Sequence, residues 1–533
     1  MANSAAKSAA NSAANPAQPN RFFGTEIEYG ISSPDNPDVS PILTSTQAVL
    51  AFAHEQEEGL SGRIRWDYAP ESPLRDSRGF DLRRYHQPPI VDPNAVGAAN
   101  LLVQNGARFY VDHAHPEYSS PETATAREAV IADRAGDKIM LRAAQLAAEA
   151  TDAEGNPGPV LKLYRNNVDG KGASYGAHEN YLFSRETEFD DIVAGLTPFF
   201  VTRQVFTGAG RVGLGQTGQE SGFQISQRAD YIETEVSLET TLNRGIINTR
   251  DEPHADSDRF RRLHVIIGDA NMSEVATFLK LGTTGLVIDA IEDGVRFDDL
   301  QLRNPVEAVH KVSRDLTCTE KLQLADHVTW MSAVETQYEY LRRVESYDQQ
   351  GDVVKLWREV LDVLADDPRK AAHLLDWVAK YNLMEGLRTR LGAGWDHPKL
   401  ALIDIQYSDI DPTRGLYHAL VRRGSMRTLV SEEEVNRAVE YAPESTRAYV
   451  RGGILRRFGK DVVAGSWTSL VVDTSGVYRR TRDVESPGIT LAYITLDEVD
   501  RFTAADCGEV LESAETVAEV VEHLRTLGAI REQ

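Results

Sequence analysis

The stretch RFFGTEIEYGI (residues 21–31) sets the fold expected for this chain. Its alternating pattern predicts a β-strand, and the side chains on one face are Thr25, Ile27, Tyr29 and Ile31. Glu26 and Glu28 share the other face, because strand side chains repeat every two residues. The apolar neighbours indicate that this strand lies inside a domain, where unpaired carboxylates are costly. The pair therefore indicates a site for a partly hydrated magnesium ion rather than for zinc. The alternative is that the two glutamates bind no metal and lie on a solvated face of the sheet.

The segment ARFYVD (residues 107–112) predicts a second strand with reactive groups on one face. Arg108, Tyr110 and Asp112 alternate along it, so a cation, a phenol and a carboxylate point to the same side. The run HAHPEYSSPE (113–122) follows and adds Glu117 and Glu122 close behind. An interior aspartate near a metal-bound nucleotide is suited to act as a general base or a nucleophile.

Histidines and arginines gather at the edges of further predicted strands. SYGAHENYLF (174–183) carries His178, and the segment 248–274 carries His254 and His264 among several arginines. This mixture is typical of sites that hold phosphates and metal together, although a single histidine is more often structural. VLKLYRNN (160–167) and ENYLFS (179–184) are expected to form a hairpin across the glycine-rich turn between them.

Two other interpretations are weaker. His113 and His115 would share a strand face, but no cysteine or histidine cluster completes a four-ligand zinc site. GAGRVG (208–213) matches a dinucleotide fingerprint, yet it follows a helical pattern rather than a strand, which argues against a Rossmann fold. The phosphate-binding pattern G-x-x-x-x-G-K-[ST] does not occur, so an ATP site would be of another kind.

The composition excludes several classes of protein. The 533 residues include 57 basic and 81 acidic ones, a net charge of −24, which disfavours binding to nucleic acid or to an anionic membrane. No apolar run is long enough to span a membrane, and two cysteines, Cys318 and Cys507, exclude a disulfide scaffold. We therefore expect a cytoplasmic protein. Arginine clusters, such as the one at Arg479, Arg480 and Arg482, leave room for a groove that meets an anionic ligand.

Composition also suggests a division of the chain. Residues 1–20 are rich in Ala, Asn and Ser and are expected to be a disordered tail. Residues 21–440 are expected to form the catalytic domain, with an insertion at 59–93 that has no period but several aromatic side chains. Short strands and helices after residue 440 predict a small C-terminal domain, 441–533.

The motifs together resemble one protein family. GTEIEYGI, NGARFYVDHAHPEYSSPE, YGAHENYL, INTRDEPHADSDRFRRLHVIIGDANMSE and SWTSL occur in order over most of the chain. They are similar to the family of Pup ligases and Pup deamidase/depupylases, within the superfamily of glutamine synthetase and γ-glutamyl-cysteine ligase. The resemblance implies an α+β fold with an antiparallel sheet packed against helices, and a smaller C-terminal α/β domain.

Two features favour the deamidase/depupylase branch of this family. The insertion, with WDYAPESPLRDSRG (66–79), resembles a loop that the ligases lack, and HAHPE is one residue shorter than the ligase segment. This branch implies hydrolysis of the C-terminal glutamine side chain of Pup and of the bond between Pup and substrate lysines, with ATP and Mg²⁺ as bound cofactors. The alternatives are a ligase that consumes ATP through a γ-glutamyl phosphate, and an inactive module that binds Pup.

The resemblance also implies roles for single residues. Asp112 matches the catalytic aspartate, and the positions that match magnesium ligands are Glu26, Tyr110 and Glu117. The positions that match nucleotide contacts are Arg108, Ser120 and Trp467. No role is assigned to Glu28, His178, His254 or His264. The implied partners are Pup, a small acidic disordered protein, and pupylated proteins, bound by a monomer.

Overall fold

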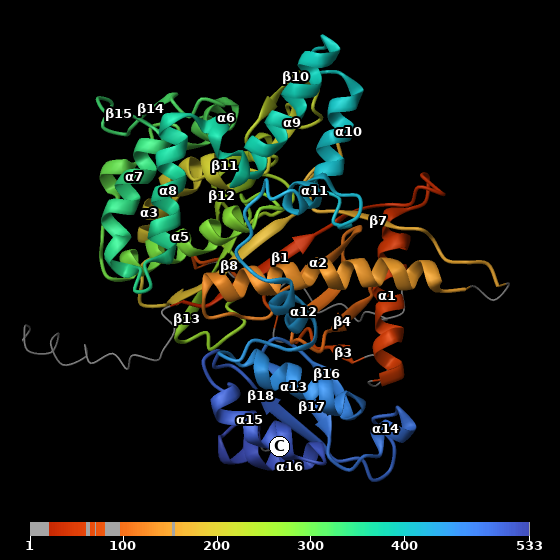
Figure 1. Ribbon diagram of the computed structural model, residues 1–533. Helices are drawn as coiled ribbons and strands as arrows, with labels where there is room; N and C mark the ends of the chain where they lie inside the picture. Colours follow the sequence, from red (N-terminus) through yellow and green to blue (C-terminus); the bar gives the residue numbers. More distant parts are fainter. Residues whose placement is uncertain (1–20, 60–63, 70, 80–95, 152–154, 532–533) are drawn as a thin grey trace, which may run out of the picture.

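The computed structural model describes residues 21–59, 64–69, 71–79, 96–151 and 155–531. The expected tail, 1–20, and residues 80–93 of the expected insertion lie outside the described residues. Figure 1 shows helices in the upper part, a sheet across the middle, and a smaller region built from the end of the chain below. None of the described helices is long and apolar enough to cross a membrane.

A six-stranded sheet forms the centre of the molecule, in the order β13-β8-β1-β6-β5-β4. Its strands are β1 (Phe23–Glu28), β4 (Asn100–Leu102), β5 (Arg108–Asp112), β6 (His115–Ser119), β8 (Ala177–Ser184) and β13 (Phe260–Val265). Every neighbouring pair is antiparallel. The structure thus confirms the expected α+β fold with an antiparallel sheet.

The first strand is shorter than predicted. It ends at Glu28, and β2 (Gly30–Ser32) leaves the central sheet to pair with β7 (Lys162–Tyr164). A Cβ atom at Gly30 would lie 2.6 Å from the Tyr175 hydroxyl, so the turn away needs glycine. The expected hairpin between residues 160–167 and 179–184 is therefore wrong, because β7 pairs with β2 and β8 pairs with β1 and β13.

Helices cover one face of the central sheet. Helix α1 (Pro41–Gly59) contacts β5 and β6, α2 (Ala126–Glu149) contacts β1, and α5 (Glu274–Glu292) contacts β8. The strand residues that face them are buried and mostly apolar, among them Ile27, Phe109, Tyr118 and Leu263. Thr125 and Ser273 cap α2 and α5 through side-chain oxygens that accept a backbone N–H. The other face of the sheet is left to polar side chains.

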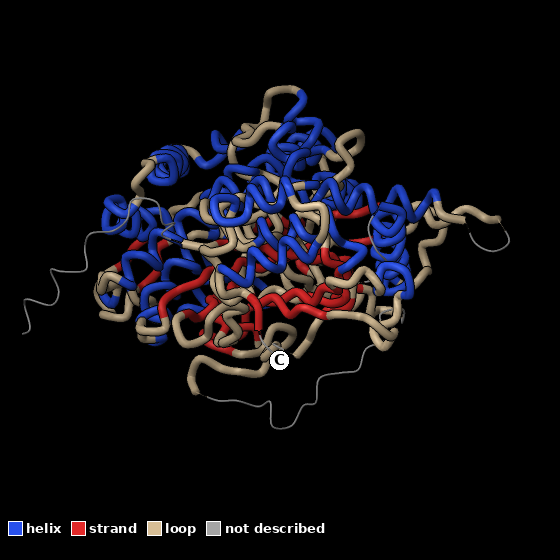
Figure 2. The backbone as a smooth tube through the Cα atoms, turned by 90° about the horizontal axis from the view of Figure 1, so that it is seen from below, coloured by secondary structure: helices blue, strands red, loops and turns tan. Residues whose placement is uncertain are grey.

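The upper part is mostly helical, and Figure 2 shows helices gathered largely on one side of the strands. Its helices are α3 (Phe189–Thr202), α4 (Gln204–Thr207), α6 (Pro305–Arg314), α7 (Ala333–Val344), α8 (Asp352–Asp366), α9 (Asp376–Leu391), α10 (Pro398–Tyr407) and α11 (Leu416–Arg422). The next helix, α12 (Glu432–Glu440), lies lower and packs against α2. Short strands pair beside them: β9 (Arg211–Leu214) with β10 (Glu220–Gln224), β11 (Ile232–Ser237) with β12 (Arg244–Asn248), and β14 (Lys321–Gln323) with β15 (Trp330–Ser332). GAGRVG runs from α4 into β9, the reverse of the strand-to-helix order of a dinucleotide site.

A second sheet lies in the lower part, in the order β19-β18-β17-β16-β3. Its strands are β3 (Arg65–Trp66), β16 (Val462–Gly465), β17 (Ser469–Asp473), β18 (Leu491–Thr495) and β19 (Ile530–Arg531), with helices α13 (Ala448–Phe458), α14 (Tyr478–Thr481), α15 (Ala504–Ser513) and α16 (Val517–Thr526). These elements share a separate hydrophobic cluster. Because β3 comes from the expected insertion and runs parallel to β16, part of that insertion is a structural element rather than only a loop.

Candidate active site

The polar face of the central sheet brings together most of the residues predicted for the site. Strand register places Glu26 opposite Ser119 on one side and His178 on the other. Glu117 lies opposite Glu28 on one side and Tyr110 on the other. Because all these strands are neighbours, side chains that are distant in sequence share one surface.

Three carboxylates form the first cluster on this face. One oxygen each of Glu28, Asp112 and Glu117 lies within 4.8 Å of the others, and Tyr110 Oη donates a hydrogen bond to Glu117 Oε1 at 2.6 Å. Burial and the charges of Asp112, Glu28 and Glu26 raise the pKa of Glu117 well above its ordinary value. A cation would relieve this repulsion, and oxygen ligands of this kind suit magnesium.

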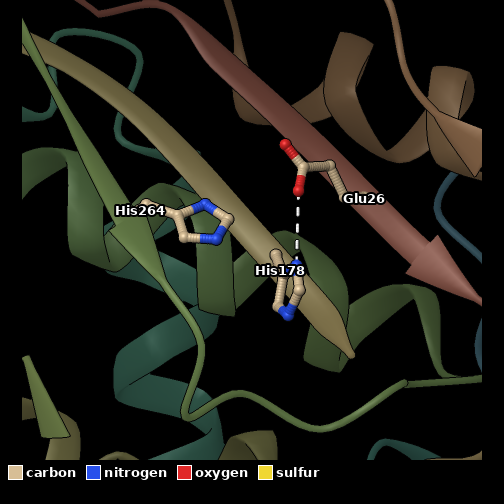
Figure 3. A group of neighbouring side chains, drawn as sticks. All are labelled: Glu26, His178 and His264. Carbon is tan, nitrogen blue, oxygen red and sulfur yellow. Dashed lines mark hydrogen bonds and ion pairs between the residues drawn. The ribbon is translucent and has the colours of Figure 1, made fainter. Parts of the chain in front are cut away.

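A second group joins Glu26 to His178 and His264, whose ligand atoms also lie within 4.8 Å of one another. Figure 3 shows the three side chains gathered from β1, β8 and β13. His178 Nδ1 lies 3.3 Å from Glu26 Oε2, and the two imidazole rings are 4.8 Å apart. A carboxylate and two imidazoles are suitable donors for a divalent cation.

Electrostatics keep this second group ready to bind a cation. Burial raises the pKa of Glu26, but the hydrogen bond with His178 and the charge of Arg262 outweigh it and hold that pKa well below its ordinary value. Burial and the charge of Arg262 lower the pKa of His264 well below its ordinary value. At neutral pH Glu26 is therefore ionised and His264 is neutral, the forms that bind metals.

Asp112 lies at the end of β5, and 39% of its side chain is exposed. His113 Nδ1 lies 2.6 Å from Asp112 Oδ2. Burial raises the pKa of Asp112, but the hydrogen bond and charge of His113 outweigh it, so that pKa is lowered. The same hydrogen bond raises the pKa of His113 to about 9. Asp112 is thus an ionised, accessible carboxylate beside two others.

Arg108 is held between aromatic rings. Its guanidinium carbon lies 3.9 Å from the centre of the Trp66 ring and 4.0 Å from that of Tyr110. Its Nη1 is 3.6 Å from Glu71 Oε1, and the Trp66 ring meets Trp467 edge-on at 5.6 Å. Trp66 and Glu71 come from the expected insertion, so its described part docks on two of the predicted nucleotide contacts.

Two adjoining cavities open beside these residues. The larger, of about 370 Å³, is lined by polar groups that include Arg108, Asp112 and Arg262. The smaller, of about 70 Å³, is lined largely by apolar groups and by Arg447. Both are lined by Glu26, Ser119, His254, Arg262 and Trp467. A polar chamber joined to an apolar one fits a ligand with a charged end and a flat apolar end.

Ser120 lines the smaller cavity, but its hydroxyl bonds to backbone. Ser120 Oγ accepts a hydrogen bond from Thr25 N at 3.0 Å and donates one to the Pro121 carbonyl at 3.1 Å. Those two bonds connect β1 to the segment after β6. Its position is therefore at the site, while its hydroxyl is occupied.

Glu28, His178 and His264 belong to the two clusters, although no role was assigned to them from the sequence. The signal for Glu28 was its place beside Glu26 on one strand face, which was noted as a pair. His178 and His264 are brought to Glu26 by strand pairing, because β8 pairs with β1 and β13 pairs with β8. The sequence pattern does not reveal that pairing. The predicted set of Glu26, Tyr110 and Glu117 is divided between the two clusters, with Tyr110 as a hydrogen-bond donor to Glu117.

The whole chain is similar to several known proteins. The family model described as Pup-ligase protein matches residues 21–471. A Pup deamidase/depupylase of Mycolicibacterium smegmatis is 54% identical over 95% of this chain and 99% of its own length. The ligase PafA in complex with Pup has a TM-score of 0.74 at 30% identity, covering 96% of this chain and 93% of that one. PafA in complex with ADP has a TM-score of 0.67 at 34% identity, covering 78% and 90%.

Proposed function

This chain belongs to the Pup-ligase protein family, and on that premise we propose that it hydrolyses amide bonds at the C-terminal residue of Pup. It converts the side chain of a C-terminal glutamine to glutamate, and it cleaves the isopeptide bond between Pup and a substrate lysine. Both reactions break a bond at the same side-chain carbonyl. The high identity to a Pup deamidase/depupylase supports hydrolysis over ligation.

The observation that carries this proposal is the setting of Asp112. It is ionised, 39% exposed and part of the lining of the polar cavity, and it lies within 4.8 Å of the buried Glu117 and Glu28. Such a carboxylate can attack the amide carbonyl as a nucleophile, or remove a proton from an attacking water. As a nucleophile, Asp112 would form an anhydride with the side-chain carbonyl as the bond to nitrogen breaks, and water would then hydrolyse that anhydride to glutamate. As a base, it would let water attack the carbonyl directly. In both routes ammonia or the lysine amine leaves with a proton that comes from the water.

The residues present fit magnesium. Glu117 and Glu28 of the first cluster would hold it with carboxylate oxygens, and Glu26 would add a further carboxylate from the second group. When bound, magnesium supplies positive charge that neutralises phosphate and carboxylate groups. Tyr110, predicted from the sequence as a metal ligand, would orient Glu117 beside the ion through its hydrogen bond. Glu28 joins the set proposed from the sequence.

The two cavities fit ATP as a bound cofactor. Its phosphates would lie in the polar chamber against Arg108 and Arg262, and its base in the apolar one against Trp467. The relative PafA has been solved with ADP, which supports a nucleotide at this site. Ser120 would contribute through its place in the wall of the smaller cavity rather than through a free hydroxyl.

Pup and pupylated proteins are the proposed partners, as the complex of PafA with Pup supports. Arginines on a chain of net charge −24 would steer an acidic segment toward the site. The proposed compartment is the cytoplasm, which two free and buried cysteines support.

One experiment separates hydrolysis from ligation. The protein is incubated with ATP and Pup that ends in glutamine, and mass spectrometry follows Pup while ADP is counted. A hydrolase yields Pup ending in glutamate with much less than one ADP per turnover. A ligase instead requires Pup ending in glutamate, joins it to a lysine, and releases one ADP per bond. An inactive Pup-binding module changes neither.

A further inference from the structure

The turn that carries Asp112 has an unusual backbone. Only His113 and Ala114 separate β5 from β6, and His113 has a φ of +52°. Two-residue hairpin turns place glycine, asparagine or aspartate at such positions, because other side chains are strained there. A histidine at this point therefore has a conformational cost that glycine would not have.

Burial does not offset that cost. The His113 side chain is 69% exposed, so it gains little from packing. Its described polar contact is with the neighbouring Asp112, where Nδ1 donates to Oδ2 at 2.6 Å. This bond is short, and a carboxylate acceptor makes it stronger than a neutral one.

Asp112 needs such a partner. Its oxygens lie within 4.8 Å of those of Glu28 and Glu117, and like charges at that distance repel. With 39% of its side chain exposed, Asp112 has room to rotate away toward water. The bond from His113 occupies Oδ2 and leaves Oδ1 as the oxygen free to act on a substrate.

We propose that His113 is a positioning residue that holds the Asp112 carboxylate in its reactive orientation, at the expense of a strained turn. The inference rests on the proposed function of Asp112. It predicts that replacing His113 lowers the rate of hydrolysis far more than it changes the stability of the fold. A purely structural histidine would lower both together.

Three variants test this. His113→Gly relieves the strain and removes the donor, two changes with opposite effects on stability, so the midpoint of thermal unfolding should change little while kcat for Pup cleavage falls by about 10- to 100-fold. KM for Pup should change less than kcat, because the lost contact joins two side chains of the enzyme. His113→Asn keeps a side-chain donor and tolerates positive φ, so it should recover part of the lost kcat.

His327→Gly is the matched control. His327 has a φ of +62° in the turn between β14 and β15, remote in the fold from the central sheet. Its replacement should relieve a similar strain and leave kcat unchanged. Wild-type kcat in His113→Gly, or an asparagine variant no faster than the glycine variant, would overturn the inference. If the unaltered protein hydrolyses neither Pup-glutamine nor a Pup conjugate, the proposed function itself is wrong.

Discussion

Glu117, which is buried, and Glu122, which is partly buried and follows it on the same segment, have opposite electrostatic settings. Burial raises the pKa of both, and the charges of Asp112, Glu28 and Glu26 raise that of Glu117 further. At Glu122, Arg451 and Arg447 reverse the effect and lower the pKa to about 2. Arg447 and Arg451 balance the charge of Glu122, whereas Glu117 lies among further carboxylates, where we propose a magnesium ion. The contrast is between a balanced ion pair and an unbalanced carboxylate cluster.

The largest expected effect comes from removing the reactive charge next to Glu117. Asp112→Asn should lower deamidation and depupylation by about 10²- to 10⁴-fold, because the amide can act neither as nucleophile nor as base. The fold should persist, since one repulsive charge is lost from the cluster. Rates are measured with mass spectrometry and folding with thermal unfolding. A variant that keeps most of its activity would show that Asp112 is not the catalytic group.

Replacing each glutamate with glutamine should change stability in opposite directions. Glu122→Gln leaves Arg447 and Arg451 without their carboxylate and should destabilise the protein by about 3 kcal/mol. Glu117→Gln should leave stability unchanged or higher in magnesium-free buffer, yet weaken the binding of Mg-ATP. Urea unfolding and calorimetric titration measure the two effects. Equal destabilisation by both changes would remove the distinction between the two sites.

The pH dependence should differ in the same way. The folded state lowers the pKa of Glu122 to about 2, so its stabilising effect is complete above the ordinary value of 4.5 and is lost as pH falls toward 2. The folded state raises the pKa of Glu117, so the metal-free protein loses stability as pH rises from 4.5 through the raised value. Magnesium should restore that loss. Unfolding curves across pH, with and without Mg²⁺, test it, and Glu117→Gln should remove the response to the ion.

The smallest effect is expected at the aromatic contact of Arg108. Trp66→Ala removes a ring 3.9 Å from the guanidinium, a contact worth about 1 kcal/mol, and should raise the KM for ATP about fivefold. Trp330→Ala, at a side chain 53% exposed on β15, is the control and should leave that KM unchanged. Because β3 belongs to the second sheet, trimming residues 59–93 should disturb that sheet as well as nucleotide binding. An unchanged KM in Trp66→Ala would mean that the ring only completes the sheet.

Strand periodicity predicted which side chains share a face, but not which faces meet. Glu26 with Glu28, and Arg108 with Tyr110 and Asp112, follow from a repeat of two. The division into two clusters depends on the register of β1 against β6 and β8, which joins residues far apart in sequence. The same lack of register information made the expected hairpin wrong. The roles of the seven site residues and the domain boundary at 440 stay predictions, and the separate core of the lower sheet supports that boundary.

The pairing of β3 with β16 has a consequence for how the protein is made. Arg65 and Trp66 leave the ribosome early, but their partners Ala464 and Gly465 lie near the other end of the chain. Contacts so distant in sequence form late, because a long loop must close first. Trp467 also arrives with that last segment. The nucleotide cavity is therefore completed only when synthesis is nearly finished, so a truncated or nascent chain carries the carboxylates of the site without the walls that would hold ATP against them.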